Sequence, residues 1–311
     1  NVFYNLFSSY LRAVGNSKAP LFFLVFSACL NVGLDLFFIV VLKMGVAGAA
    51  WATNLSQAIS ALLCIVYIYC KVPALVPEKK HWRLTAGDTC YQMQMGIPMA
   101  LQFAITSSGT MIMQSAINLF GSEAVAAYTA ACKVHSLLTQ GMVAMGQTMA
   151  VYSGQNYGKG DAKRIRDGVK AALLIDVIYS VVSAVLVSLL LGVTLGLFFS
   201  GDVDLTVMMP WARTYITICT LFYIPLSTIF IFRNTMQGCG YGFLPMMGGV
   251  VELVARLSVA MIAMRVHSYA LSCFCDPAAW LSAGLFTGVS YLFVMKKIRA
   301  SLEPKSVTVQ P

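Results

Sequence analysis

The stretch Leu11–Pro20, LRAVGNSKAP, organises the chain, because its spacing returns once, far downstream, as Met236–Pro245, MQGCGYGFLP. In both copies a glycine precedes a proline by five residues, and the proline opens a long apolar run. Ala49-Ala50-Trp51 then returns as Ala278-Ala279-Trp280 at nearly the same distance. Repetition at this long period predicts a chain built from two similar halves, as in many membrane transporters.

Most of the chain is too apolar for a water-soluble protein. Of its 311 residues 59% are apolar and 11% are charged, whereas soluble domains carry roughly 25% charged residues. A helix of about 20 apolar residues crosses the hydrocarbon core of a membrane. Apolar runs of this kind cover 20–42, 46–70, 96–119, 124–153, 170–199, 210–232, 244–264 and 278–295, after a partial run at 1–11. The composition predicts an all-α integral membrane protein with eight full transmembrane helices and one partial helix.

The basic residues indicate how the chain is oriented. They give a net charge of +9, which would suit nucleic acid if they formed one face with aromatic groups. Instead they flank the apolar runs. When the spans alternate in direction, sixteen Lys and Arg fall on one side and only Lys43 and Arg265 on the other. This bias places the sixteen, and the C-terminus, in the cytoplasm and argues against a nucleic-acid partner.

Motifs of enzymes and metal sites are missing from the sequence. The nine cysteines lie in or beside apolar runs, and Cys273 and Cys275 have no further ligands at metal-binding spacing; we expect small buried side chains. Ser153–Asp161 lacks the glycine spacing of a phosphate loop. With no paired acids, His cluster or nucleophile motif, an intramembrane enzyme is a remote alternative, and we expect no metal and no cofactor.

Glycine and proline predict where helices end and bend. Gly15 suits a helix C-terminus, and Pro20 suits the first turn of the next helix. Ser153–Asp161 is expected to form a tight turn in which a glycine ends one helix and Asp161 caps the next. Pro225 is expected to bend the span 210–232, because proline removes a helix hydrogen bond.

Glu252 and Arg256 are the strongest candidates for a functional site. They are four residues apart and share one face of a helix. At 1.5 Å per residue from Pro245 they lie about 10 and 16 Å into the membrane, and neither belongs against lipid. Two interpretations stay open. The pair is a neutral structural ion pair, or Glu252 exchanges a proton or Na⁺ while Arg256 and cargo compete for it.

Other polar residues inside spans are weaker candidates. Asp35 is either functional or simply faces water or a neighbouring helix. Gln102, Thr106 and Gly109 share a helical face that would line a cavity. Lys133 lies about 14 Å into its span, where an unpaired ammonium is costly. The predicted cavity lining is Gln102, Thr106, Lys133, Gln147, Glu252 and Arg256, with Asp35 in the first half.

Several of these stretches together resemble the multidrug and toxic compound extrusion (MATE) family. They are Leu11–Gly15 with Pro20, Asn31–Asp35, Gly45–Ala50, Gly96–Pro98 with Gln102, Gly154–Asn156 with Gly160–Asp161, and the second copy, Gly240–Pro245. They span nearly the whole chain in the family's order. The resemblance implies two six-helix lobes, twelve helices in all, around a central cavity in the plasma (bacterial inner) membrane.

On that template the chain divides into four parts. Residues 1–70 would be the remainder of the N-terminal lobe, namely the end of its fourth helix, the fifth and the sixth. Residues 71–87, with Lys79 and Lys80, would be a cytoplasmic linker, 88–300 the C-terminal six-helix lobe, and 301–311 a cytoplasmic tail. Asn1 stands inside an apparent helix, and its counterpart in the second half is about residue 226, so we expect roughly 130 to 140 residues of the first lobe to precede it.

The resemblance also implies a function. It is the export of cationic or amphipathic compounds in exchange for Na⁺ or H⁺ by alternating access, by a protein that is monomeric when full length. The expected partners are small organic cations or amphipathic compounds and the lipid bilayer. Some relatives carry an acid in the seventh helix, but Gly96–Leu119 has none, so the coupling ion stays open. A flippase of lipid-linked cargo is the alternative; Lys133, Arg213 and Arg256 would permit the cationic cavity it requires.

Overall fold

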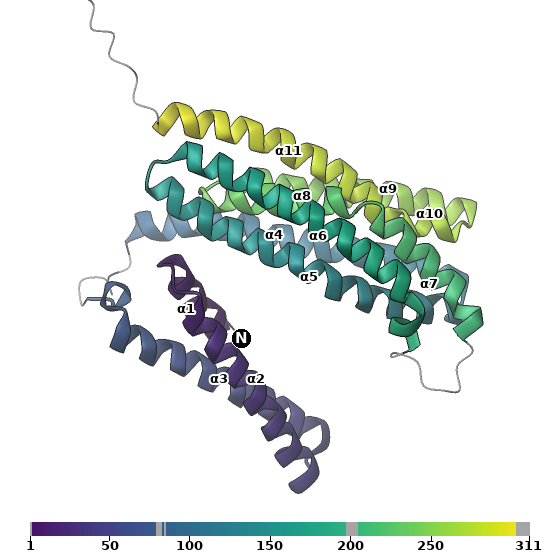
Figure 1. The fold of residues 1–311 in the computed structure, drawn as a ribbon, viewed down its shortest axis with the longest axis horizontal. Coiled ribbons are helices and arrows are strands. Elements are labelled where there is room, and N and C mark those ends of the chain that lie inside the picture. The colour runs from purple at the N-terminus through teal and green to yellow at the C-terminus, as the bar shows by residue number, and fades with distance from the viewer. Residues whose placement is uncertain (1, 79–82, 84, 197–204, 303–311) are drawn as a thin grey trace, which may run out of the picture. The chain divides into compact units, whose positions relative to one another are not determined.

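The computed structural model describes residues 2–78, 83, 85–196 and 205–302, and within these ranges the chain is helical without a single strand (Figure 1). The predicted all-α class is confirmed. The chain forms two compact units, Asn1–Ala86 and Gly87–Pro311. Lys79 and Lys80 of the predicted linker, and the predicted tail from residue 303 onward, lie outside the described residues. The assignment of the units to lobes stays a prediction.

The first unit is a small group of packed helices. Its elements are α1 (Val2–Ala13), α2 (Lys18–Leu36), a π-helical turn η1 (Phe37–Val41), α3 (Gly45–Lys71) and a short 3₁₀ turn η2 (Pro73–Leu75). Leu11 and Cys64 are fully buried in its core. The hydroxyl of Ser27 donates to the carbonyl of Ser56, at 2.9 Å, and so ties α2 to α3. Small polar residues of this kind hold helices together in an apolar solvent.

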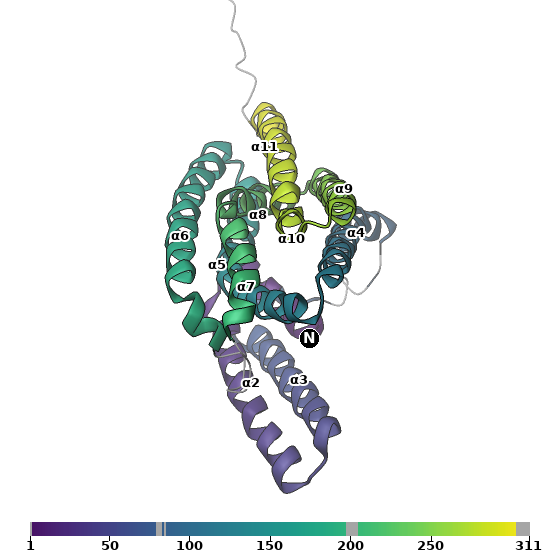
Figure 2. The same cartoon turned by 90° about the vertical axis from the view of Figure 1, so that its right-hand side faces the viewer.

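The second unit is a larger helical bundle. Its elements are α4 (Ala86–Ile117), η4 (Asn118–Phe120), α5 (Ser122–Gly158), α6 (Ala162–Gly196), α7 (Leu205–Thr220), α8 (Tyr223–Gly238), α9 (Phe243–Val266), α10 (Tyr269–Cys273) and α11 (Cys275–Leu302). Figure 2 shows α6 on one side of this bundle and α4 and α9 on the other, with α5, α7 and α8 between them. Met142, Tyr215 and Ile229 are among the fully buried side chains at its centre.

All eight predicted spans overlap helices, but two of these helices, α4 and α5, have no stretch that is apolar enough to count as a membrane span. By length and composition, five helices of the described chain can cross a membrane, or six when α7 and α8 count as one broken span. The predicted spans 96–119 and 124–153 correspond to α4 and α5, which are 32 and 37 residues long. Both have ample length, and α4 begins already at Ala86, well before Gly96. Their apolar residues are interrupted by polar ones, because both helices line the cavity described below.

The repeated glycine turn has the same geometry in both copies. Gly15 and Gly240 each adopt a φ of +86°, a left-handed conformation that costs glycine little. In each copy the amide after the glycine donates to the carbonyl five residues earlier, at 2.9 Å. This bond closes the end of a helix around a left-handed residue. The predicted helix end at Gly15 is confirmed, and the internal repeat extends to backbone geometry.

A third turn of the same kind joins α5 to α6. Gly160 has a φ of +80°, and the Asp161 side chain accepts a hydrogen bond from the amide of Arg164 at 2.8 Å. The predicted cap at Asp161 is therefore confirmed. The turn itself is shorter than expected, because α5 continues through Ser153 to Gly158.

The predicted bend at Pro225 is also confirmed. The helix breaks between Thr220 and Tyr223, and the axes of α7 and α8 differ by 50°. Proline has no N–H to donate to the carbonyl four residues earlier, which here belongs to Leu221. The break therefore falls one turn before the proline.

Small residues bring α5 and α8 into close contact. A side-chain carbon on Gly146 would lie 2.7 Å from the side-chain nitrogen Nδ2 of Asn234, and one on Gly154 would lie 3.0 Å from the carbonyl oxygen of Gly238. A carbon on Gly238 would overlap the carbonyl of Ala150. Small residues at four-residue spacing on α5, namely Gly146, Ala150 and Gly154, thus let the two helices approach closely, as is typical of membrane helices.

The cysteines are free, and not all of them are buried as expected. Five are buried, whereas Cys29, Cys70 and Cys90 are exposed. Cys29 lies within the α2 span, where an exposed side chain meets lipid, and a thiol is apolar enough to be placed there.

Candidate functional site

A cavity of about 610 Å³ lies within the second unit. It is lined from α4, α5, α7, α8, α9 and α11, so most of the bundle contributes to it. Most of the residues that α4 and α5 turn toward it are polar, which explains why neither helix is apolar all along its length. The polar ones are Gln102, Thr106, Thr110 and Gln114 from α4, and Thr129, His135, Ser136 and Thr139 from α5.

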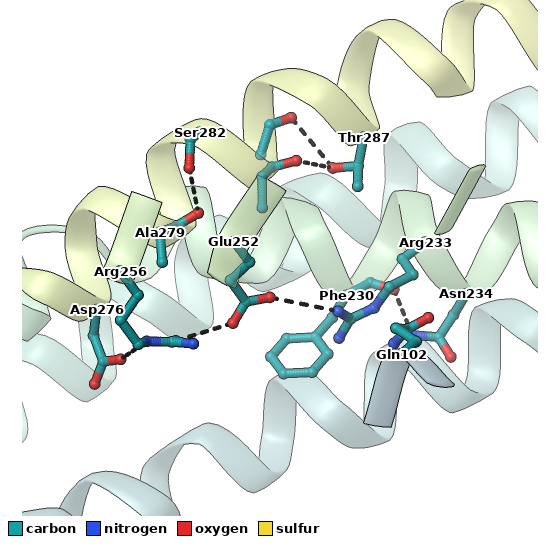
Figure 3. A network of polar contacts seen from close by, with 12 residues as sticks. Gln102, Phe230, Arg233, Asn234, Glu252, Arg256, Asp276, Ala279, Ser282 and Thr287 are labelled. Atoms are coloured by element: carbon teal, nitrogen blue, oxygen red, sulfur yellow. Dashed lines mark hydrogen bonds and ion pairs between the residues drawn. The ribbon is translucent and has the colours of Figure 1, made fainter. Parts of the chain in front are cut away.

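A buried network of four charged side chains forms part of the wall (Figure 3). The Arg256 guanidinium donates from Nη2 to Glu252 Oε1 at 3.0 Å and from Nε to Asp276 Oδ1 at 2.9 Å. Arg233 forms a longer ion pair, 3.9 Å from Nη1 to Glu252 Oε2. The Arg256 side chain is only 3% exposed and that of Glu252 only 7%. Glu252 thus lies between two arginines, and Arg256 between two carboxylates.

The network is balanced in charge, and this balance makes its burial tolerable. Two guanidinium groups face two carboxylates from α8, α9 and α11. A buried ion pair contributes little net stability, but removal of one partner leaves an uncompensated charge and typically costs about 3–5 kcal/mol. Any step that changes the charge of one carboxylate therefore has a large effect on the other three groups.

Helix α4 meets this network at closely packed positions. Gln102 Oε1 accepts a hydrogen bond from Gln237 Nε2 on α8 at 2.8 Å. Gly109 lies against the Arg256 guanidinium so closely that a side-chain carbon there would overlap Nη1. Within the described residues, Arg256 Nη1 and Thr106 Oγ1 are buried without a hydrogen-bond partner. Two buried donors beside the cavity are therefore unsatisfied in this structure.

Aromatic rings form another part of the wall. His135 stacks on Trp280, with ring centroids 5.6 Å apart and planes 9° apart, and its Nδ1 lies 3.0 Å from the Tyr223 hydroxyl. Tyr128 and Tyr215 meet edge to face at 5.0 Å. Aromatic faces attract flat apolar groups and cations, so this wall suits amphipathic cations.

The structure brings four of the seven predicted site residues into one place. Gln102, Thr106, Glu252 and Arg256 line the cavity. Lys133 and Gln147 do not. Both are exposed side chains of α5.

Helical periodicity explains both exceptions. Lys133 follows Cys132, which faces the cavity, and the next residue of a helix points about 100° away. Gln147 lies two turns beyond Thr139, the last α5 residue of the lining. Their selection rested on depth and polarity rather than on the helical face.

Asp35, the remaining predicted site residue, belongs to the first unit. Its Oδ1 is buried without a hydrogen-bond partner among the described residues, as are Asn31 Nδ2 and Gln57 Oε1. Asn31 and Asp35 are four residues apart on one face of α2. The first unit therefore has its own polar group, and Asp35 stays a candidate.

Two members of the network, Arg233 and Asp276, escaped the sequence analysis. Arg233 stands directly after the predicted span 210–232, and Asp276 shortly before the predicted span 278–295. Both positions lie just outside the predicted spans, where charges are normally solvated. In the structure α8 continues to Gly238 and α11 starts at Cys275, so both residues are inside helices.

Comparison with known proteins gives consistent matches. The MatE family model matches residues 98–262. The probable multidrug resistance protein YpnP of Bacillus subtilis is 36% identical over 164 residues, which are 52% of this chain and 36% of that protein. YoeA of the same organism, also a probable multidrug resistance protein, is 24% identical over 76% of this chain and 52% of its own length. The chain thus spans between about a third and a half of these relatives.

Solved structures resemble the fold over nearly the whole chain. A crystal structure of a MATE protein in complex with MaL6 has a TM-score of 0.86 at 19% identity, covering 96% of this chain and 67% of its own. An outward-facing multidrug resistance MATE family transporter of the MOP superfamily has a TM-score of 0.82 at 20% identity, covering 98% and 67%. At these identities the likeness concerns the fold alone.

Proposed function

The chain belongs to the MatE family, and on this premise we propose that it exports cationic or amphipathic compounds in exchange for Na⁺ or H⁺. Family membership makes it a multi-pass membrane transporter rather than an enzyme. Matched relatives are named as multidrug resistance or multidrug export proteins. Their names support a drug-like cargo for this chain.

One observation carries the proposal: the cavity in the second unit joins an aromatic wall to a buried carboxylate held by arginines. A cation that enters is attracted by the rings of Tyr128, Tyr215 and Trp280 and by the carboxylate of Glu252. It competes there with Arg233 and Arg256 for the same negative charge. Cargo and coupling ion would therefore exclude one another at Glu252.

Such competition is what antiport requires. If cargo and ion favour different orientations of the protein, and each displaces the other, the binding of one drives the release of the other. Glu252 is the better placed of the two carboxylates, because it forms ion pairs with both Arg233 and Arg256, whereas the ion pair of Asp276 is with Arg256. We assign it the exchange of H⁺ or Na⁺, with Asp35 as a second acid in the first unit.

The charged network in the cavity wall is neutral overall, so the cavity does not offer the positive charge that the lipid-linked anions of a flippase require. A flippase requires a cationic cavity, for which Lys133, Arg213 and Arg256 were the candidates. Lys133 and Arg213 lie outside the lining, and Arg256 is neutralised by two carboxylates. The excess of basic residues on one side supports an orientation in the plasma membrane with the C-terminus in the cytoplasm. We also propose that the full-length protein functions as a monomer.

The test is transport by the reconstituted protein. Efflux of a fluorescent organic cation from proteoliposomes is measured under an imposed Na⁺ or pH gradient. Glu252→Gln should remove the dependence of efflux on the gradient. Glu123→Gln changes an exposed acid in the first turn of α5 and should leave it intact. Normal gradient-driven efflux by correctly folded Glu252→Gln protein would overturn the proposal.

A further inference from the structure

The imidazole of His135, on the cavity wall, is held by aromatic side chains from three other helices. It stacks on Trp280 of α11, with ring centroids 5.6 Å and planes 9° apart. The rings of Tyr215 on α7 and Tyr223 on α8 lie 6.0 and 5.5 Å from it, centroid to centroid. The Tyr223 hydroxyl also lies 3.0 Å from His135 Nδ1. Contacts from several sides lock a side chain in one orientation, so this imidazole is preorganised.

The Tyr223 hydroxyl decides which nitrogen of the imidazole carries the proton. Tyr223 is fully buried, and among the described residues its hydroxyl bonds to His135 Nδ1 alone. If Nδ1–H donated to the hydroxyl oxygen, the phenolic hydrogen would be left buried without an acceptor, which is costly. The hydroxyl therefore donates to Nδ1, and the neutral imidazole carries its proton on Nε2.

The second ring nitrogen, Nε2, is open to the cavity. It forms no hydrogen bond to a described residue, and it does not belong to the polar atoms of the described chain that are buried without a partner. Nε2 is therefore accessible, and the space beside His135 is the cavity that this residue lines. The aromatic wall thus carries an N–H donor whose direction is fixed.

Threonine hydroxyls in the same lining do not duplicate this donor. Thr110, Thr129 and Thr139 each donate to a backbone carbonyl of their own helix, at 2.7, 2.7 and 3.1 Å. Toward the cavity these hydroxyls therefore offer lone pairs, which accept hydrogen bonds. A cargo group that can only accept, such as a carbonyl oxygen, finds a partner at His135 rather than at these threonines.

We propose that the cavity favours cations that also carry a hydrogen-bond acceptor, and that His135 Nε2 is the donor that recognises this acceptor. The inference rests on the proposed function, because it takes the positive charge of the cargo to be held by Glu252 and the aromatic rings. A cation without an acceptor displaces water from Nε2 and leaves the donor unpaired, which weakens its binding. His135 is thus a specificity-determining residue, and Tyr223 is a positioning residue that keeps the proton on Nε2.

The test is isothermal titration calorimetry of the detergent-solubilised protein with a matched pair of cations, (para-acetylphenyl)triphenylphosphonium and (para-isopropenylphenyl)triphenylphosphonium. The first has a C=O group where the second has a C=CH₂ group of nearly the same shape. We expect the wild type to bind the ketone about fivefold more tightly than the alkene, the effect of one hydrogen bond between neutral groups.

Variants of the pair His135 and Tyr223 test the assignment. His135→Phe/Tyr223→Phe keeps a flat ring at each position and leaves no hydroxyl without a partner, so it should bind both cations equally. Its affinity for the alkene should stay close to that of the wild type, which shows that the cavity is intact. Tyr223→Phe alone lets the proton move to Nδ1 and should reduce the preference for the ketone. An undiminished preference in Tyr223→Phe would contradict the positioning role of Tyr223.

His267→Asn is the matched control. His267 is an exposed histidine outside the cavity lining, and its φ of +52° is one that asparagine tolerates. This variant should keep the wild-type preference. Equal binding of the two cations by the wild type would overturn the inference and leave the proposed function standing, as would a preference that persists in the double variant. If the wild type bound neither cation, the proposed function would fail together with the inference.

Discussion

Asn31 stands in the first copy of the repeat where Arg256 stands in the second: each lies eleven residues after the proline that opens its helix, Pro20 or Pro245. The two positions share a helical backbone but differ in chemistry. Arg256 is held by two carboxylates, whereas Asn31 Nδ2 is buried without a partner among the described residues. The repeat therefore preserves the turn and the helix, while each unit has its own set of polar groups.

The charged network should make Arg256 important for stability. Arg256→Met leaves Glu252 and Asp276 buried beside an apolar group, and we expect it to lower the free energy of unfolding by about 3–5 kcal/mol. Arg213→Met removes an exposed arginine outside the network and should change it by less than about 0.5 kcal/mol. Denaturation of the detergent-solubilised proteins measures both. Equal effects of the two changes would contradict a structural role of the network.

The contact between Gly109 and Arg256 should not tolerate a methyl group. In Gly109→Ala the new carbon overlaps the guanidinium, so Arg256 must move away from its carboxylates. We expect a loss of about 1–3 kcal/mol together with slower efflux. Gly96→Ala is the matched control on the same helix, because nothing lies within 4 Å of its added carbon. It should be neutral or stabilising by up to about 1 kcal/mol.

The glycine turn can be tested without any packing change. Gly15 has a φ of +86° and open space around it, whereas Gly33 in α2 also has open space but an ordinary helical backbone. Gly15→Ala should destabilise the protein by about 1–2 kcal/mol, the cost of a left-handed alanine. Gly33→Ala should be neutral or stabilising. If thermal unfolding of the two variants is alike, the left-handed turn is not needed for stability.

The aromatic wall should contribute to cargo affinity. Trp280 is 5% exposed and stacks on His135. Trp280→Leu should weaken binding of a fluorescent organic cation roughly tenfold, because a cation–aromatic contact is lost, and Trp280→Phe should retain most of the affinity. Trp51, its counterpart in the first copy, is 57% exposed. Trp51→Leu is the control that should leave the titration unchanged, and an equal loss there would locate the binding elsewhere.

The sequence by itself determined the family resemblance, the helical class and most of the local structure. Left-handed glycine turns, the break near Pro225 and the cap at Asp161 depend on a few neighbouring residues, and membrane helices depend on bulk apolarity. These features hold whatever packs against them. The resemblance rested on the same short stretches, and the match of the MatE family model confirms it.

Only the tertiary structure decided which polar residues meet. Glu252 and Arg256 could be paired from sequence because they share one helix, but Arg233 and Asp276 join them from α8 and α11. Lys133 has the expected depth on α5 but lies on a different face from the residues that line this cavity. Depth follows from counting along one helix, whereas the face that meets a cavity depends on how several helices pack, and no single helix contains that information.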